Sequence, residues 1–369
     1  MSELGSRTTI RNPADSDEPQ MVELLSRVFQ RWPEFEIPVT DVEHLRWKMR
    51  SEPLAARHHW VTEIDDRIVV MLLRIVRRFR VRGRDYLAKD GVDAAVDPRY
   101  QGQRLYVAMV DVAKADGRDE EFHFGCSFTT NPRLRRRNLR FGTRSLANGI
   151  QVLEKPFHAR AIVAKRRKKH PGRSPTWLAV LRIKLRTVSN RCGHPPYLDR
   201  TQFAGSFATL ERFGDDIEAF FDDAARAFEF VIVRSKDYLN WRYCDSAAGR
   251  FTVRIAAQDD RILGYLVFKI SEGTGYIADL LALPDRPDVV RSLIEDALRV
   301  FRGARVDSVT CWMISRHPYN RILRRYGFVD SKRDVGFEYR TITVDSGEVE
   351  FLDDPRARIH LTHGDSDWV

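Results

Sequence analysis

The hydrophobic positions along the chain follow two periods, and together they predict alternating strands and helices. Apolar residues spaced three and four positions apart, as at Met21, Leu24, Leu25 and Val28, are typical of one face of a helix. Short runs such as residues 60–64 are typical of strands, and Asp65-Asp66 after that run predicts a tight turn into a second strand.

Both halves of the chain give the order strand, helix, antiparallel strands, helix, strand, helix, strand. This order predicts an α/β protein in which mixed sheets are flanked by helices. In the first half we expect strands at 9–11, 60–64, 67–76, 87–96 and 122–127, and helices near 15–29, 102–115 and 132–141. In the second half we expect strands at 251–257, 261–270, 276–282, 308–314 and 335–344, and helices at 215–228, 288–301 and 319–326. The strand at 335–344 is expected to close the second sheet.

Two passages match at a constant offset of 194 positions, which indicates an internal repeat. Leu45-Arg46-Trp47-Lys48 aligns with Leu239-Asn240-Trp241-Arg242, and Asp65-Asp66-Arg67-Ile68 aligns with Asp259-Asp260-Arg261-Ile262. We therefore predict a domain at 1–157, a basic segment at 158–200 and a second copy of the first domain at 201–369.

Several markers in this order resemble the GCN5-related N-acetyltransferase (GNAT) family, in its tandem bacterial form. Residues 96–103 (Val-Asp-Pro-Arg-Tyr-Gln-Gly-Gln) are similar to the end of its fourth strand and the start of its cofactor loop. Asn131-Pro132 followed by Leu139-Arg140-Phe141-Gly142 resembles the next helix and its stop, as does Tyr326-Gly327-Phe328 in the second copy. The resemblance implies two tandem GNAT-like domains.

The resemblance also implies that acetyl-CoA is the co-substrate, its pyrophosphate resting on backbone N–H groups at the start of a helix. The family pattern fits at Gln101, but Arg104 and Tyr106 replace its small residues. Either Arg104 adds a cation for phosphate, or the segment is a packed turn without a ligand. The predicted cofactor-binding residues are Val96, Gln101, Gly102, Gln103, Arg104, Leu105, Tyr106 and Asn131.

The equivalent loop of the second copy, residues 283–288, has two prolines, two acidic residues and no glycine. Prolines lack the N–H donors that a phosphate requires, and carboxylates repel it. We expect this copy not to bind the cofactor.

An amine acceptor must lose a proton, so a carboxylate or histidine is expected near the central strands. Asp93 is the leading candidate and His123 the second, although strand residues of either type often serve only structural hydrogen bonds. The resemblance places a tyrosine acid four residues before the helix-ending glycine, where this chain has Asn138 and Leu323.

The net charge of +10 comes from one segment. Between Lys155 and Leu198 there are twelve Lys or Arg and no Asp or Glu, whereas the remainder carries 50 basic and 52 acidic residues. A helix is expected after Ser174, with an apolar stripe at Trp177, Leu178, Leu181, Leu185 and Val188. Three uses of residues 158–191 remain open: an anionic membrane surface, a polyanion, or packing between the domains with the stripe buried.

No run of about 20 apolar residues predicts a membrane span. The N-terminus has no signal pattern, the four cysteines show no metal spacing, and no base-reading motif appears. We therefore expect a cytoplasmic N-acyltransferase, with no metal and no sequence-specific nucleic acid, that moves acetyl from acetyl-CoA to an amine by direct attack. The alternatives are an inactive tandem GNAT used as a scaffold and a membrane-peripheral acyltransferase of envelope polymer synthesis.

Overall fold

The computed structural model of the chain describes residues 8–51, 58–117, 121–140, 142–169, 176–193, 203–366 and 368. The predicted cap Ser174, and Phe141 at the end of the helix predicted at 132–141, lie outside these residues.

The first half contains the elements that the pattern predicts, plus a helix, α2, and two strands, β6 and β7, that it missed. Its elements in order are β1 (Thr8–Arg11), α1 (Glu18–Phe29), α2 (Asp41–Arg46), β2 (Trp60–Ile64), β3 (Arg67–Val81), β4 (Arg84–Val96), α3 (Leu105–Ala115), β5 (Phe124–Thr129), α4 (Pro132–Arg140), β6 (Arg144–Ser145) and β7 (Ile150–Pro156).

Two helices, α5 (Ala159–Lys169) and α6 (Thr176–Gly193), connect the halves. The second half then repeats the plan of the first. Its elements are β8 (Ser206–Leu210), α7 (Asp216–Ala225), β9 (Phe230–Ile232), α8 (Lys236–Leu239), β10 (Thr252–Gln258), β11 (Arg261–Ser271), β12 (Thr274–Ala282), α9 (Pro287–Gly303), β13 (Ser308–Ile314), α10 (Pro318–Arg325), β14 (Val329–Thr341), α11 (Ser346–Val349) and β15 (Ile359–His360).

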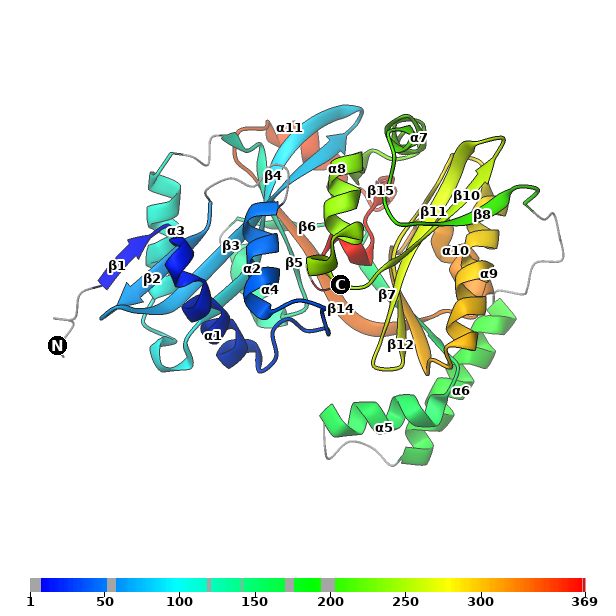
Figure 1. Cartoon of the computed structure of the whole chain (residues 1–369), viewed down its shortest axis with the longest axis horizontal. Coiled ribbons are helices and arrows are strands. Elements are labelled where there is room, and N and C mark those ends of the chain that lie inside the picture. Colours follow the sequence, from blue (N-terminus) through cyan, green and yellow to red (C-terminus); the bar gives the residue numbers. More distant parts are fainter. Residues whose placement is uncertain are drawn as a thin grey trace.

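The halves exchange their last long strands, so that one continuous sheet runs through the molecule (Figure 1). The strand order is β1-β2-β3-β4-β5-β14-β7-β13-β12-β11-β10-β8. Gly336–Thr341 of β14 pair with β5 of the first half, whereas β7 pairs along its length with β13 of the second. The expectation that residues 335–344 close the second sheet was therefore wrong, since Gly336–Thr341 pair with β5 of the first half, and only the preceding part of β14 pairs with β7.

The Trp motifs found by the 194-residue offset meet at the centre of the molecule. Trp47 and Trp241 both lie in short π-helical turns, Trp47–Ser51 and Asn240–Cys244. Their rings stack with centroids 4.7 Å apart, and the Nε1 of each donates to the backbone carbonyl of the other, at 3.1 and 3.4 Å. Reciprocal contacts of this kind are those of equivalent residues about a local two-fold axis.

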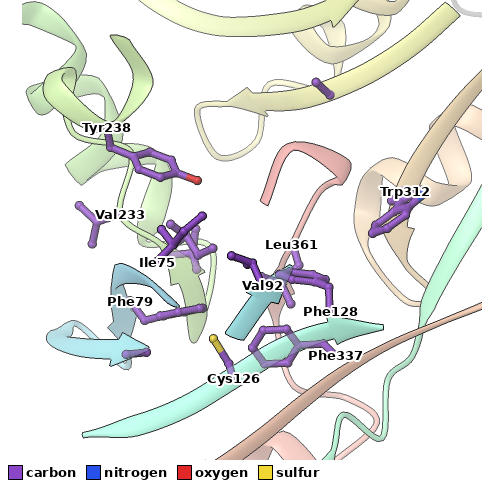
Figure 2. Packing of buried hydrophobic residues seen from close by; sticks show 14 of the residues in the cluster. Ile75, Phe79, Val92, Cys126, Phe128, Val233, Tyr238, Trp312, Phe337 and Leu361 are labelled. Atoms are coloured by element: carbon purple, nitrogen blue, oxygen red, sulfur yellow. The ribbon is translucent and has the colours of Figure 1, made fainter. Parts of the chain in front are cut away.

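Alternate residues of the central strands divide between an inner and an outer core, as the two-residue period of a strand requires. On β3, Met71 and Leu73 join α1 and the second half in one large cluster, whereas Val70 and Leu72 pack with α3. Figure 2 shows the large cluster, in which Val92, Phe128, Phe337 and Leu361 lie together although they come from β4, β5, β14 and the C-terminal segment. The halves thus share the core behind the candidate site.

Candidate active site

The two central parallel strands of the first half separate before they end. β4 and β5 are paired only from Ala88↔Phe124 to Asp90↔Cys126. Beyond that point β4 continues to Val96 and β5 to Thr129 without pairing to each other. Because parallel strands end at the same edge of a sheet, the loops that follow Val96 and Thr129 flank this separation.

Asp93 lies on β4 in this separated stretch, where the strand bulges. Its φ of 45° accompanies a register shift between β3 and β4. The carboxylate accepts hydrogen bonds from Trp32 Nε1 at 3.0 Å and from Lys48 Nζ at 2.8 Å, and both charged side chains are more than nine-tenths buried. A bulge re-aims a side chain beside a site, and here it turns Asp93 toward the segment from Trp32 to Lys48.

Asp97 fixes the turn from β4 into the cofactor loop. It is fully buried, and it accepts from the backbone N–H and the guanidinium of Arg99 and from Arg27 Nη1 of α1 at 2.7 Å. The hydrogen bonds from Arg99, with smaller help from Arg27, hold the pKa of this carboxyl well below its usual range. The charged carboxylate therefore ties α1 and the loop to the end of β4.

The cofactor loop, residues 97–104, has a left-handed backbone conformation at Gly102 and also at Arg104, although glycine favours this conformation. Gly102 has a φ of 85°, and Arg104, the residue before α3, has φ 62° and ψ 11°. Arg104 thus adopts the left-handed conformation at the position where the family has its first small residue. Its side chain is exposed and makes no capping hydrogen bond, so the substitution keeps the backbone path of the loop and adds a cation beside it.

The first turn of α3 follows directly on the loop that leaves β4. The first hydrogen bond of the helix runs from Ala108 N to Arg104 O, so the N–H groups before Ala108 have no carbonyl partner within the helix. No acidic residue lies in this turn. Leu105 and Tyr106 are half-buried and pack with Val96 against the cluster under α3.

Asn131 lies across the separation, after β5. Its Oδ1 accepts from Leu134 N, which caps the start of α4. Further along α4, Asn138 donates from Nδ2 to Glu338 Oε2 at 2.7 Å, and Glu338 comes from the exchanged strand β14 and is buried. The position where the family has a tyrosine is thus occupied by an amide bound to a carboxylate from the other half.

His123 lies at the far end of β4, away from the loop. Its Nδ1 accepts from Leu87 N at 3.1 Å, and its carbonyl accepts from the backbone after β14. Leu87 and Val96 are nine positions apart on β4, so a rise of about 3.3 Å per residue places them roughly 30 Å apart. The fold brings Asp93, Val96, the loop and Asn131 to one end and leaves His123 at the other.

The equivalent loop of the second half differs in the way that its sequence suggests. Asp285 takes the left-handed conformation with φ 58°, and α9 begins at Pro287, which has no N–H. Asp288 in the first turn is bound by Arg286 at 2.7 Å, and that hydrogen bond is the main reason why the pKa of Asp288 is lowered. A carboxylate of the chain itself thus occupies the start of α9.

Three contributors to the site were not found from the sequence. Lys48 stands in the repeated Trp motif, so the repeat marked its position but not its contact with Asp93. Asp97 lies inside the recognised stretch, but its bonds to Arg99 and Arg27 depend on the fold. Glu338 carries no sequence signal, because the exchange of β14 alone brings it to Asn138.

Comparisons with known proteins agree with this description. Residues 9–138 match the family model of the acetyltransferase (GNAT) domain. No curated protein matches the sequence. Residues 9–138 therefore form an acetyltransferase domain of the GNAT type, and the predicted resemblance and enzyme class are confirmed.

Solved structures share the fold over nearly the whole chain. A probable N-acyltransferase of Enterococcus faecalis is similar at 12% identity and a TM-score of 0.61, covering 92% of this chain and 73% of that one. Saccharomyces cerevisiae N-myristoyltransferase with bound myristoyl-CoA has 12% identity and a TM-score of 0.60, and the match covers 92% of this chain and 83% of that one. A GCN5-related N-acetyltransferase of Anabaena variabilis has 11% identity and a TM-score of 0.59, and the match covers 91% of this chain and 73% of that one. The predicted fold class is confirmed.

Proposed function

We propose that this chain is an N-acyltransferase that moves an acetyl group from acetyl-CoA to the amine of a small-molecule or peptide acceptor. The observation that carries the proposal is the loop before α3, where Arg104 adopts a glycine-like backbone and no acid competes for the helix start. The pyrophosphate would rest on the N–H groups of this turn, with the Arg104 guanidinium as an added cation. Val96, Gln101, Gly102, Gln103, Leu105, Tyr106 and Asn131 complete the proposed cofactor site.

In the proposed reaction the acceptor amine passes a proton to Asp93 and attacks the thioester carbonyl as a neutral amine. A carbon–nitrogen bond forms, the carbon–sulfur bond breaks, and the leaving CoA thiolate takes up the second proton that the amine nitrogen loses. The two oxygens of Asp93 already accept hydrogen bonds from Trp32 and Lys48. The proposed base is therefore a carboxylate that is paired with the ammonium group of Lys48. His123 is not carried into this scheme, because it lies at the other end of β4.

We propose that the second half shapes the acceptor side and does not hold CoA. Pro287 and the Arg286–Asp288 pair at the start of α9 support this division. The boundaries at 157 and 200 remain our proposal for the units of the repeat. The exchange of β7 and β14 means that these units share strands.

The test is calorimetric titration of acetyl-CoA into the purified full chain and two charge-reversal variants. Arg104→Glu places an acid beside the proposed pyrophosphate and should weaken binding at least about tenfold. Arg286→Glu makes the same change before α9 and should leave the affinity unchanged. Arg104→Gly, which restores the family residue, should still bind.

Circular dichroism of each variant shows whether it is folded. If the folded wild-type chain does not bind acetyl-CoA, the enzyme proposal fails and an inactive scaffold is favoured by the Arg104 and Tyr106 substitutions. If Arg286→Glu abolishes binding and Arg104→Glu does not, the cofactor belongs to the second half. Titration of myristoyl-CoA alongside separates acetyl from longer acyl groups, since the yeast relative was solved with that ligand.

A further inference from the structure

Within the part of the chain that the structure describes, helix α6 carries an exposed apolar face at the periphery of the molecule. Figure 1 shows α5 and α6 projecting from the edge of the second half. α6 packs on α5, on α10 and on β14, and Asn190 Nδ2 donates to Arg324 O of α10 at 2.8 Å. The helix is thus attached along one side.

The opposite side is apolar and exposed. Trp177, Leu181, Leu185 and Val188 are 66, 43, 58 and 57% exposed. Their spacing of four, four and three residues places them within an arc of about 80°. Ala179, Val180, Ile183 and Thr187, which lie on the other side of the helix, are half-buried. A stripe buried between the domains was one expectation, and the structure contradicts it for these four residues.

Cations border the stripe on both sides. At 100° per residue, Lys184 lies about 20° before Trp177 around the helix, and Arg182 lies about 60° beyond Leu185. Arg186 lies about 40° further round, on the polar side. All three are exposed. The stretch from Lys155 to Leu198 contains no acidic residue, so the face has a cationic border without compensating carboxylates from its own segment.

We propose that this face, made of Trp177, Leu181, Leu185 and Val188 with Arg182, Lys184 and Arg186, docks the protein on an anionic lipid surface. An amphipathic helix with basic flanks lies in the interface of a bilayer, with its apolar side chains in the acyl boundary. Lys and Arg side chains near such a surface are attracted by its negative potential. A second copy of this chain fits the face less well, since two such cationic borders would repel each other.

The helix would lie on the membrane and would not cross it. Among the residues that the structure describes, no helix is both long enough and apolar enough to span a bilayer. The proposal does not rest on the enzyme activity, because it concerns a helix outside the residues matched to the acetyltransferase domain.

The experiment is sedimentation of the full chain with vesicles of phosphatidylcholine alone and with added phosphatidylglycerol. We expect binding to the anionic vesicles that falls as salt is raised. Trp177→Ala with Leu185→Ala should weaken it at least about tenfold, and Arg182→Gln with Arg186→Gln should weaken it and flatten its salt dependence. The fluorescence of Trp177 is obtained as the difference between the emission spectra of the wild type and Trp177→Phe. Its emission maximum should move to shorter wavelength when anionic vesicles are added.

Two double variants elsewhere on the surface serve as matched controls. Ile270→Ala with Val300→Ala removes apolar side chains that are each 41% exposed, and Arg226→Gln with Arg356→Gln removes cations that are 77 and 81% exposed. Neither should change vesicle binding. Equal loss in the controls, no binding to anionic vesicles, or a Trp177 emission that does not move would overturn the proposal. Tight binding of single-stranded RNA that needs Arg182 and Arg186 but not Trp177 or Leu185, without vesicle binding, would assign the face to nucleic acid.

Discussion

At the scale of single residues, the candidate site depends on charges that the core holds in place. Asp93 and Lys48 form a pair in which both side chains are almost fully buried, next to the indole of Trp32. Removing one member of such a pair leaves the other charge buried without compensation, which costs more than removing both. The same residue is our proposed base, so its structural and chemical roles must be separated by experiment.

We expect Asp93→Asn to lower the free energy of unfolding by about 3 kcal/mol, because Lys48 loses its carboxylate. Adding Lys48→Met should recover most of this stability. Urea unfolding of the wild type, both single variants and the double variant measures the effect. If Asp93 is the base, the double variant should regain stability but should release CoA from acetyl-CoA much more slowly than the wild type when an amine acceptor is present. A double variant with wild-type turnover would make Asp93 a structural residue only.

Two buried histidines make stability depend on pH. Burial is the main cause that lowers the pKa of His44 to about 3 and the pKa of His59 to about 4. His59 Nδ1 accepts from Arg74 N at 3.2 Å, and a protonated ring could not accept there. The folded protein therefore keeps both rings neutral, while the unfolded chain binds protons below its ordinary histidine pKa of about 6.5.

The free energy of unfolding should consequently fall as the pH is lowered from 6.5 toward 4, by up to about 1.4 kcal/mol per pH unit for each histidine. Denaturant unfolding at pH 7.5, 6.0 and 5.0 measures this slope. His44→Gln removes one of these histidines and should reduce the slope by up to about 1.4 kcal/mol per pH unit. Gln258→Ala, a change at an exposed residue that does not titrate, gives the control and should leave the slope as it is. A flat profile between pH 7.5 and 5.0 would contradict this account.

At the scale of elements, the paired π-helical turns join the two copies of the repeat. The stacked rings of Trp47 and Trp241, and their reciprocal bonds to each other's backbone, bury two large side chains at the junction. Aromatic pairs of this kind contribute about 0.5–1.5 kcal/mol beyond the area that they bury.

We expect Trp47→Ala and Trp241→Ala each to lower the free energy of unfolding by about 3–5 kcal/mol. In a double-mutant cycle the two losses should couple by at least about 0.5 kcal/mol, because the residues touch. Trp60→Ala, in the outer core of the first half, is the comparison and should not couple with Trp241→Ala. Strictly additive losses for the stacked pair would show that the junction does not act as a unit.

At the scale of the whole molecule, the strand exchange makes each half incomplete without the other. β5 of the first half pairs on its outer side with β14, and β9 of the second half pairs with the end of β3. A sheet edge left open in this way exposes unpaired backbone groups and, here, the apolar face around Phe128.

We therefore expect the fragment 1–157 to be unfolded or aggregated when it is produced alone. Co-expression with residues 158–369 should restore a soluble complex, because β14 and β7 can then reach their partners. Size-exclusion chromatography and circular dichroism distinguish the outcomes. A monomeric, folded 1–157 that unfolds cooperatively would show that the exchange is dispensable.

The local elements and the repeat could be predicted from the sequence alone, whereas the cofactor role of the loop stays a prediction. Hydrophobic period, Asp-Asp turns and proline positions depend on neighbouring residues, so the strands around Asp65-Asp66 and Asp259-Asp260 and the helix after Arg104 were predicted close to their observed bounds. The repeat of the Trp motif at 194 positions also follows from spacing alone.

Three features could not be predicted without the folded structure: the strand that completes each sheet, the charges that meet at Asp93, and the face of α6 that stays exposed. Strand β14 pairs with β5, some 200 positions earlier in the chain. Asp93 meets Lys48 from 45 positions away. These contacts depend on the energy of packing the whole core, to which the pattern around any single residue contributes little. The exposed stripe of α6 has the same cause, because a helical period shows that an apolar face exists but not what covers it.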